Sequence, residues 1–444
     1  MATATKEKSE YREAWEESQR RAATVLPAWA ARRRAAAFET FERLGFPTTD
    51  QEDWKYTNVA PIARSPFAAP RGRSLTAGEA GAVAQSLYAE AGRSRLVFVN
   101  GYLSASLSSL GALPAGVVVS SLWDALCGGR AEMLRERVGS AAAADADGFA
   151  ALNAAHLGEG AFVYLPEGVR LEAPLHLSFV AGDEDAPLVN PRVVLVAERD
   201  SSATIIESYE ASRDSAYFTN AVVEVFVGDG ARLTHYKVQR ESEQAYHVAT
   251  TAAEIGRGGV YDLTTITLGA RLSRHGVSVR MAREGAECWV DGLYLVGAGQ
   301  HADTHSAIDH VAPRCTSHQI YKGILDGDAR AVFNGKVFVH PGAQATDAQQ
   351  TNKNLLLSPD ARVDTKPQLE IFADDVKCSH GATAGQLDEE ELFYLKSRGL
   401  HDELARNLLT YGFAEELIEK IKIESIKRQL DEAILNRLHA RLEA

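Results

Sequence analysis

Apolar and polar positions divide the chain into three parts. Over residues 5–45, apolar side chains recur at steps of three and four, which is typical of amphipathic helices. Pro27 predicts a break within this helical region, and Gly45 with Pro47 just beyond predicts its end. From about 160 to 380 the helical spacing disappears and short β-branched and aromatic runs follow one another. The pattern becomes helical again near the C-terminus.

The segment between the first helices and the strand-rich region has a mixed pattern. "TTDQEDWKYTNVAP" is polar and irregular, whereas "SRLVFVNGYLSASL" places apolar runs on both sides of Asn100-Gly101. Asn-Gly between such runs is typical of a type I′ β-hairpin. Residues 60–150 are therefore expected to form a mixed α/β portion.

A small turn unit recurs through the strand-rich region. A polar residue or glycine precedes an alanine, and a strand follows. The unit occurs at Ser202-Ala203, Gly230-Ala231, Gly285-Ala286, Asp328-Ala329, Gly342-Ala343 and Asp360-Ala361. Most spacings are close to multiples of about 14 residues, which favours a solenoid of stacked rungs, and with strands alone this means a parallel β-helix. A Greek-key sandwich is the alternative, because short strands at even spacing suit it as well.

The C-terminal part is expected to contain three helices. Asp388 is a suitable N-cap for the first, and Gly399 a suitable residue just past its end. A second helix is expected to end at Gly412. The third has an apolar stripe that either the body of the protein or a partner must cover. The residues of this stripe are Ile423, Ile426, Leu430, Ile434 and Leu438.

These patterns predict a mainly β protein with three regions. Residues 1–150 would form an N-terminal helical and mixed α/β region, and residues 151–386 a parallel β-helix core. Residues 387–444 would form a C-terminal helical domain.

Composition narrows the class of protein. The chain is 45% hydrophobic and 24% charged, with a net charge of −13. Such a chain can bury a large core, and its average field repels phosphate, which argues against nucleic-acid and anionic-membrane binding. The N-terminus lacks a signal-peptide pattern, and no apolar run of about 18 residues occurs, so we expect no membrane span and a cytoplasmic location. The four cysteines form no CxxC motif, consistent with a reducing compartment.

Three familiar catalytic or nucleotide motifs are missing or unconvincing. Gly297, Gly299 and Ala302 fit G-x-G-x-x-A, but no helical pattern follows them, so a solenoid turn is expected there. The chain has no Walker A motif, which argues against ATP hydrolysis by this chain alone. It also has no G-x-S-x-G element.

One segment is dense in possible metal ligands. "HADTHSAIDHVAPRCTSH" contains His301, His305, His310, Cys315 and His318. In strands, alternate residues face opposite sides, so these groups are expected to scatter and to hydrogen-bond along the rungs. A metal site here is the alternative.

Cys378 and His380 are the sharpest candidates for chemistry. If residues 376–380 are extended, both side chains project from one face, with Cα atoms about 6.5–7 Å apart. Thiolate and imidazole are suitable ligands for iron or zinc. Two ligands do not complete a tetrahedral site, so others would have to come from distant residues or from a second protein. A buried cysteine beside a surface histidine, with no metal, is the alternative reading.

Long motifs resemble one known family. "TDQEDWKYTNVAP", "RLVFVNGYLS", "IDHVAPRCTSHQIYKGILDGDARAVFNGKVFVHPGAQATDAQQTNKNLLLS" and "VDTKPQLEIFADDVKCSHGATAGQLDEEELFYLKSRGL" are similar to the SufD branch of the SufB/SufD family of iron–sulfur cluster assembly proteins. The similarity covers most of the chain and is densest from about 305 to 400.

The resemblance implies a cytosolic, non-catalytic scaffold. It would pair through its β-helix with a SufB-like paralogue, and its C-terminal helices would dock a SufC-like ATPase. A transient iron–sulfur cluster would form where the two β-helices meet, and the isolated chain would hold no stable cofactor. A homodimer of the isolated chain and flavin binding to the complex are left open.

The same resemblance assigns roles to particular residues. By motif, His380 would contribute to the cluster site, with Cys378 as its neighbour. The ATPase would contact Phe393, Tyr394, Leu395, Ser397, Arg398 and Gly399. The resemblance also implies that partners explain two features: an ATPase partner would carry the nucleotide motif that this chain lacks, and a partner would cover the C-terminal apolar stripe.

The alternative function is a stand-alone β-helix enzyme such as a carbohydrate-active lyase, which would act on polysaccharide without partners.

Overall fold

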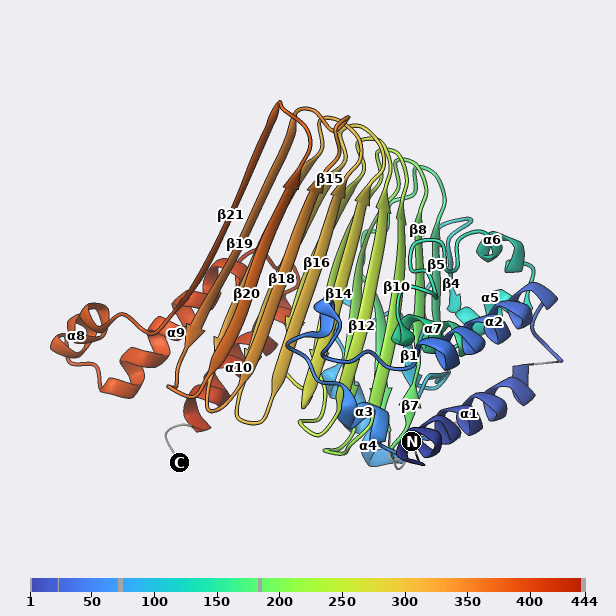
Figure 1. The fold of residues 1–444 in the computed structure, drawn as a ribbon, viewed down its shortest axis with the longest axis horizontal. Coiled ribbons are helices and arrows are strands. Elements are labelled where there is room, and N and C mark those ends of the chain that lie inside the picture. Colours follow the sequence, from blue (N-terminus) through green and yellow to red (C-terminus); the bar gives the residue numbers. More distant parts are fainter. Residues whose placement is uncertain (1, 23, 71–74, 183–185, 441–444) are drawn as a thin grey trace.

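The centre of the protein is a parallel β-helix built from two long sheets that face each other (Figure 1). The computed structural model describes residues 2–22, 24–70, 75–182 and 186–440. From β9 onward, successive strands alternate between the two sheets, and each strand pairs in parallel with the strand two places later. This connectivity confirms the predicted solenoid, and the Greek-key sandwich is wrong.

From β9 onward, the first sheet contains the odd-numbered strands of the solenoid. Its spatial order is β2 (Tyr102–Leu103), β1 (Ser94–Val99), β6 (Leu175–Ala181), β9 (Ser202–Ala211), β11 (Arg232–Arg240), β13 (Val260–Thr267), β15 (Glu287–Val296), β17 (Thr316–Leu325), β19 (Thr346–Leu356) and β21 (Val376–Gly385), with β3 (Ser109–Leu110) pairing β1.

The second sheet contains the even-numbered strands from β8 onward, together with β4, β5 and β7. Its spatial order is β20 (Arg362–Ile371), β18 (Arg330–Val339), β16 (His301–His310), β14 (Leu272–Met281), β12 (Tyr246–Ile255), β10 (Phe218–Val227), β8 (Arg192–Ala197), β5 (Gly160–Leu165) and β4 (Val118–Ser121), with β7 (Leu188–Val189) pairing β10.

The recurring turn unit has a packing reason. Its alanine lies at the start of a strand and points into the tube, so Ala231, Ala286 and Ala329 are fully buried. Gly230 and Gly285 before two of them have φ angles of 66° and 71°, which glycine adopts without strain. The spacing of about 14 residues is one strand with its turn, which is half a rung.

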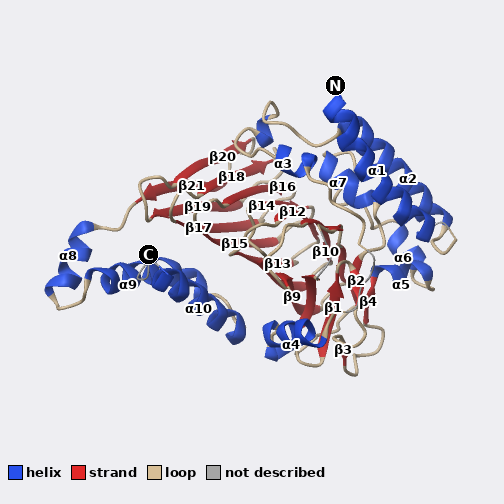
Figure 2. Cartoon of the chain, turned by 90° about the horizontal axis from the view of Figure 1, so that it is seen from below, coloured by secondary structure: helices blue, strands red, loops and turns tan. Residues whose placement is uncertain are grey.

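The N-terminal region covers the first rungs (Figures 1 and 2). Pro27 separates the two long helices, as predicted, and Asn100-Gly101 joins β1 and β2 as the predicted hairpin, with φ angles of 49° and 84°. The helices of this region are α1 (Ala2–Ala22), α2 (Ala28–Leu44), α3 (Ala60–Arg64), α4 (Ala77–Ser86), α5 (Leu122–Cys127), α6 (Ala131–Arg135) and α7 (Gly148–Ala155), with short 3₁₀ turns η1 (Glu52–Trp54) and η2 (Ala89–Ala91).

The C-terminal helices are α8 (Glu389–Ser397), α9 (Asp402–Ile418) and α10 (Glu424–Ala440). Asp388 caps α8 by accepting hydrogen bonds from two backbone N–H groups, as predicted. The expected helix end at Gly412 is wrong, because α9 continues to Ile418. A mid-helix glycine costs about 1 kcal/mol relative to alanine, whereas burying Leu417 and Ile418 beyond it stabilises the helix by more.

The apolar stripe of α10 is covered by the protein itself. Ile423, Ile426, Leu430 and Ile434 are buried, and they pack with α9 against the outer face of the first sheet (Figure 2). Leu438 lies outside the residues whose side chains are described. The explanation of this stripe by a partner is therefore wrong. In the described residues, none of the helices is long and apolar enough to cross a membrane.

Candidate functional site at the open end of the solenoid

The solenoid ends in a rung that the described part of the chain leaves uncovered. β20 and β21 are the last strands of the two sheets, and each is paired on one side only. Most residues of β21 are exposed, in contrast to the buried strands deeper in the tube. A free strand edge presents unpaired N–H and C=O groups, which makes this end a surface for strand pairing.

Cys378 and His380 lie in β21 and face the inside of the tube. They are in register with Ala348 and Gln350 of β19, both of which are almost completely buried. Because side chains alternate along a strand, the two groups share the inner face. His380 is exposed only because no rung of the described chain lies over it.

The two groups differ in their surroundings. Cys378 is half-buried and packs against the apolar core of the tube. Burial raises the pKa of its thiol, and the Asp347 carboxylate raises the pKa further. The thiol is therefore protonated near neutral pH, and the exposed imidazole is the more accessible ligand.

A polar seam lies one rung deeper, beneath His380 and the second half of β21. Gln350 Nε2 donates to Gln319 Oε1 at 2.5 Å, and Asn354 Nδ2 donates to Asn352 Oδ1 at 2.7 Å. Thr365 Oγ1 of the facing sheet also donates to Asn352 Oδ1, at 2.9 Å. The amides fill the inside of the last rungs, so the end of the tube is lined by polar groups on one side.

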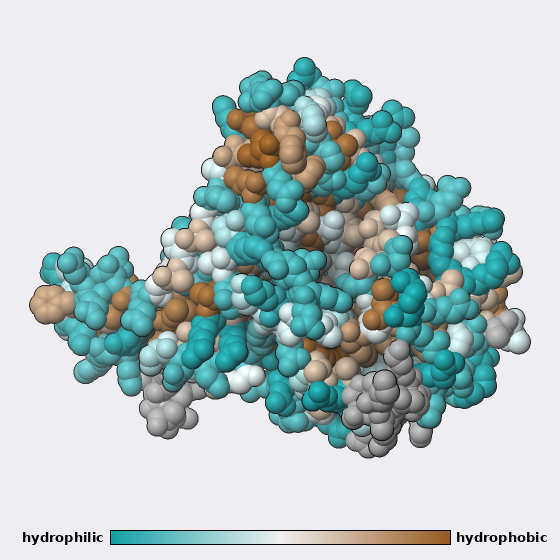
Figure 3. All heavy atoms as spheres, in the orientation of Figure 1, coloured by the Kyte–Doolittle hydropathy of each residue, from teal (hydrophilic) through white to brown (hydrophobic). Residues whose placement is uncertain are grey.

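One corner of the open end, where β20 turns into β21, is apolar. Ile371 is 38% exposed and Phe372 is 58% exposed, and the Phe372 ring lies 5.2 Å from that of Phe338. Figure 3 shows hydrophobic atoms gathered near the top of the molecule, where the turn between β20 and β21 lies in Figure 1. A free strand edge with an apolar corner is typical of a protein–protein interface.

A second exposed apolar surface lies on α8 and α9. Phe393 is 74% exposed, Tyr394 56%, Leu404 56% and Leu408 50%. The remaining residues expected to contact a partner also lie on this surface: Ser397, Arg398 and Gly399 are exposed and Leu395 is half-buried. Helix α8 stands away from the body of the protein (Figures 1 and 2).

The histidine-rich segment distributes its possible metal ligands over both faces of its strands. His310 and Cys315 point into the core, whereas His318 stacks on Trp289 outside, so these groups scatter as predicted. Among the described residues, no group of three histidine, cysteine or acidic side chains is placed to hold a metal ion. His301 and His305 lie on the same, outer face of β16, on either side of Asp303.

His301 and His305 belong to a buried polar cluster that the sequence did not predict. His305 Nε2 lies 3.1 Å from Asp303 Oδ1, and Thr57 of the "EDWKYTN" segment lies 2.9 Å from His301 Nε2 and donates to Asp303. Burial alone would raise the pKa of the Asp303 carboxyl, but Arg274 and His305 hold that pKa below its ordinary value. The cluster fixes the N-terminal segment to the second sheet.

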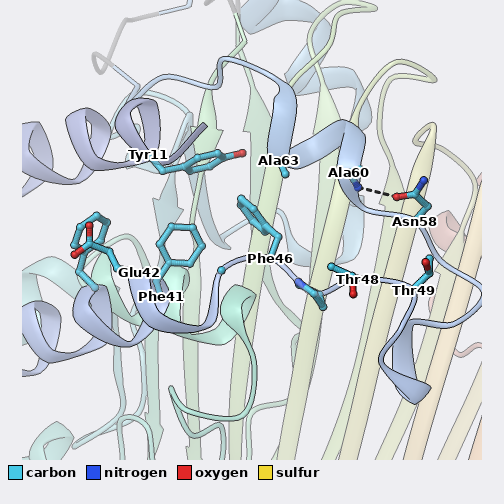
Figure 4. Close-up of a pocket in the computed structure, with 12 residues that line it drawn as sticks. Tyr11, Phe41, Glu42, Phe46, Thr48, Thr49, Asn58, Ala60 and Ala63 are labelled. Atoms are coloured by element: carbon cyan, nitrogen blue, oxygen red, sulfur yellow. Dashed lines mark hydrogen bonds between the residues drawn. The ribbon is translucent and has the colours of Figure 1, made fainter. Parts of the chain in front are cut away.

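An apolar pocket of about 280 Å³ opens between the N-terminal helices (Figure 4). Tyr11 faces Phe41 and Phe46 across it, with ring centroids 5.9 and 5.0 Å apart, and the Tyr11 hydroxyl donates to Ile62 O. Among its described lining residues, Glu42 is the one carboxylate, and no nucleophile lies beside a base. The pocket is not a candidate catalytic site.

Gly297, Gly299 and Ala302 occupy the turn between β15 and β16 and the start of β16. Gly299 has a φ of 73°, and a strand follows instead of a helix, as predicted for a solenoid turn.

Gln350, Asn352 and Asn354 are functional candidates that sequence reasoning missed. Their alternation in "QQTNKN" was the available signal, since alternate residues share one face of a strand.

Comparison with known proteins gives consistent matches along the chain. Residues 5–177 match the family model described as "SufBD protein N-terminal region", and residues 179–413 match "SUF system FeS cluster assembly, SufBD core domain". An iron–sulfur cluster assembly SufBD family protein of Synechocystis is 38% identical over 415 residues, covering 90% of both chains. The iron–sulfur cluster assembly protein SufD of Escherichia coli is 33% identical over 399 residues, covering 89% of this chain and 90% of the relative. SufD of Bacillus subtilis is 32% identical over 291 residues, covering 63% of this chain and 64% of the relative.

Proposed function

Because the chain belongs to the SufBD family of iron–sulfur cluster assembly proteins, we propose that it is a scaffold subunit that shares a nascent cluster with a partner at its open end. The observation that carries the proposal is the exposed imidazole of His380 on the unpaired last rung. The cluster is cargo, built at the site and passed on.

The partner at this end is a second β-helix protein, SufB-like in character. The free edges of β20 and β21 offer backbone groups to another pair of strands, and the apolar corner with Phe372 offers contact area. A partner docked here would supply the ligands that Cys378 and His380 lack. Covering the rung would also desolvate the site and strengthen electrostatic interactions within it.

An ATPase of SufC type docks on α8 and the start of α9. Phe393 and Tyr394 are large aromatic side chains left exposed on a helix that stands off the body, and such residues anchor many interfaces. The family match does not itself place ATP hydrolysis in a partner, so this assignment rests on the surface and on the missing nucleotide motif. With this family membership, the stand-alone lyase alternative has no observation in its favour.

The test is cluster assembly by the complete complex with His380→Ala. The chain is co-expressed with its SufB-like and SufC-like partners, the complex is isolated, and its iron, sulfide and visible absorbance are measured. We expect an intact complex with cluster yield reduced about 10-fold or more. His318→Ala, on the outer face of β17, is the matched control and should keep normal yield. Normal cluster yield in His380→Ala would remove the proposed role of the imidazole.

A further inference from the structure

Gln350 lies one rung below His380, and its side-chain carbonyl oxygen is buried without a hydrogen-bond donor among the described residues. The two residues are in register between β19 and β21, on the inner face of the tube. Gln350 is 1% exposed, its Nε2 donates to Gln319, and its Oε1 has no hydrogen-bond partner among the described residues. Leaving a buried carbonyl oxygen unpaired destabilises a fold, so such an atom calls for an explanation.

Gln319 Oε1 accepts two hydrogen bonds, one from Gln350 on the next rung of its own sheet and one from Ser306 on the facing sheet. Ser306 Oγ and Gln350 Nε2 both donate to Gln319 Oε1, at 3.5 and 2.5 Å. With its amide N–H turned toward the deeper rung, Gln350 has its carbonyl oxygen left to accept from the last rung. A Cβ on Gly335 of the facing sheet would collide with the Gln350 amide, so the glycine leaves the room that this side chain needs.

We propose that Gln350 is a positioning residue for His380. Its Oε1 accepts the N–H of one imidazole nitrogen, which fixes the tautomer and turns the other nitrogen toward the docking partner and its cluster. Adjacent rungs are about 4.8 Å apart, so a turn of the imidazole brings a ring nitrogen within reach of this oxygen. Histidines that bind metals almost always donate their second N–H to a carbonyl, carboxylate or water. This inference rests on the proposed function of His380.

The first experiment measures the tautomer of His380 directly. Protein labelled with ¹⁵N-histidine is examined by NMR at one fixed pH, and the signals of His380 are assigned by their loss in His380→Gln. We expect a single tautomer in the natural chain, and a mixture, with the two nitrogen shifts drawn together, in Gln350→Met. Asn354→Leu removes another buried amide of β19, which hydrogen-bonds to Asn352 and not to Gln350, and should leave the His380 signals of a single tautomer. Unchanged signals in Gln350→Met would overturn the inference.

The second experiment measures cluster yield in the complete complex. We expect Gln350→Met to lower the yield about 10-fold, whereas Gln350→Glu, which keeps an acceptor, and Asn354→Leu keep it. Equal losses in Gln350→Met and Asn354→Leu would show a merely structural role and overturn the inference. If Gln350→Met does not fold, Gln350→Asn replaces it. This variant keeps an amide, but its side chain is shorter by one methylene, so the oxygen no longer reaches the imidazole and we expect the same tautomer mixture and the same loss of cluster yield.

The two proposals fail in different ways. If His380→Ala keeps normal yield, the proposed function fails, while the tautomer measurement still decides whether Gln350 holds the imidazole. If His380→Ala loses yield and the Gln350 variants change neither the tautomer nor the yield, the proposed function stands and the positioning role of Gln350 is wrong.

Discussion

The guanidinium of Arg274 lies over the ring of Trp54, 3.8 Å from its centroid, and so joins the polar N-terminal segment to the second sheet. The same guanidinium is paired with the buried Asp303 carboxylate, which also accepts from Thr57. A segment whose regular structure is limited to a short 3₁₀ turn is thus held on the solenoid by a buried ion pair and an aromatic contact.

The ion pair gives the first prediction. Asp303→Ala leaves the Arg274 charge buried without its partner, which typically costs about 3–5 kcal/mol of the free energy of unfolding. Chemical denaturation monitored by tryptophan fluorescence measures the loss. Asp309→Ala is the control, because Asp309 pairs with His340 at a half-exposed site and should cost less than about 1 kcal/mol. Equal effects of the two substitutions would contradict the account of the cluster.

Acid should destabilise the fold through buried neutral histidines. Burial lowers the pKa of His176 to about 3 and that of His310 to about 4, from an ordinary value of 6.5. Above pH 6.5 both rings are neutral in the folded and the unfolded chain. Below it the unfolded chain takes up protons that the folded chain does not, so the free energy of unfolding falls as the pH drops from about 6.5 toward 3.

The total loss is on the order of a few kcal/mol, and denaturation midpoints at pH 7, 5.5 and 4.5 measure it. His310→Asn removes one of the two groups and should flatten the pH dependence, although the variant itself is less stable at pH 7. Stability that stays constant down to pH 4.5 would mean that these rings are protonated inside the fold.

The sequence predicted the solenoid well because its signals are local. Strand runs, buried alanines such as Ala231 and the left-handed turn glycines act within one rung, and stacking repeats them. The N-terminal cluster could not be predicted, because Thr57 and His301 are 244 residues apart in the chain. The end of α9 was misplaced because the burial of Leu417 on the sheet outweighs the local effect of Gly412.

The candidate site was predicted in part. The extended spacing of Cys378 and His380 gave their common face, but their exposure depends on which rung is last, a property of the whole solenoid. Gln350 was missed because a buried amide gains meaning only from the residue in register with it. The alternation of residues along one strand shows which face of the sheet a side chain lies on. Which residue lies beside it on the next rung follows only from the register of the two strands.

The aromatic surface of α8 gives a prediction about the ATPase. Phe393→Ala should weaken binding of the SufC-like partner by about 30-fold, since exposed aromatic anchors contribute about 2 kcal/mol or more when an interface covers them. The thermal midpoint of the isolated chain should not change, because the Phe393 side chain is 74% exposed. Leu435→Ala, at an exposed position of α10, is the control. Isothermal titration calorimetry measures the affinity. An unchanged affinity in Phe393→Ala would mean that the ATPase binds to another surface of the chain.

The four cysteines report whether the open end is covered in the complex. Cys378 is half-buried on the last rung and Cys127 is exposed near the opposite end, while Cys288 and Cys315 are inside the core. At pH 8, N-ethylmaleimide should label Cys127 and Cys378 of the isolated chain, with the core cysteines protected. Addition of the SufB-like partner should slow labelling of Cys378 on the order of 10-fold, because docking removes access to its thiol, and leave Cys127 unchanged. Mass spectrometry of the labelled peptides gives both rates from one sample. If Cys378 is labelled at the same rate with the partner bound, that partner does not dock on the open rung, and the cluster site has to lie elsewhere on the chain.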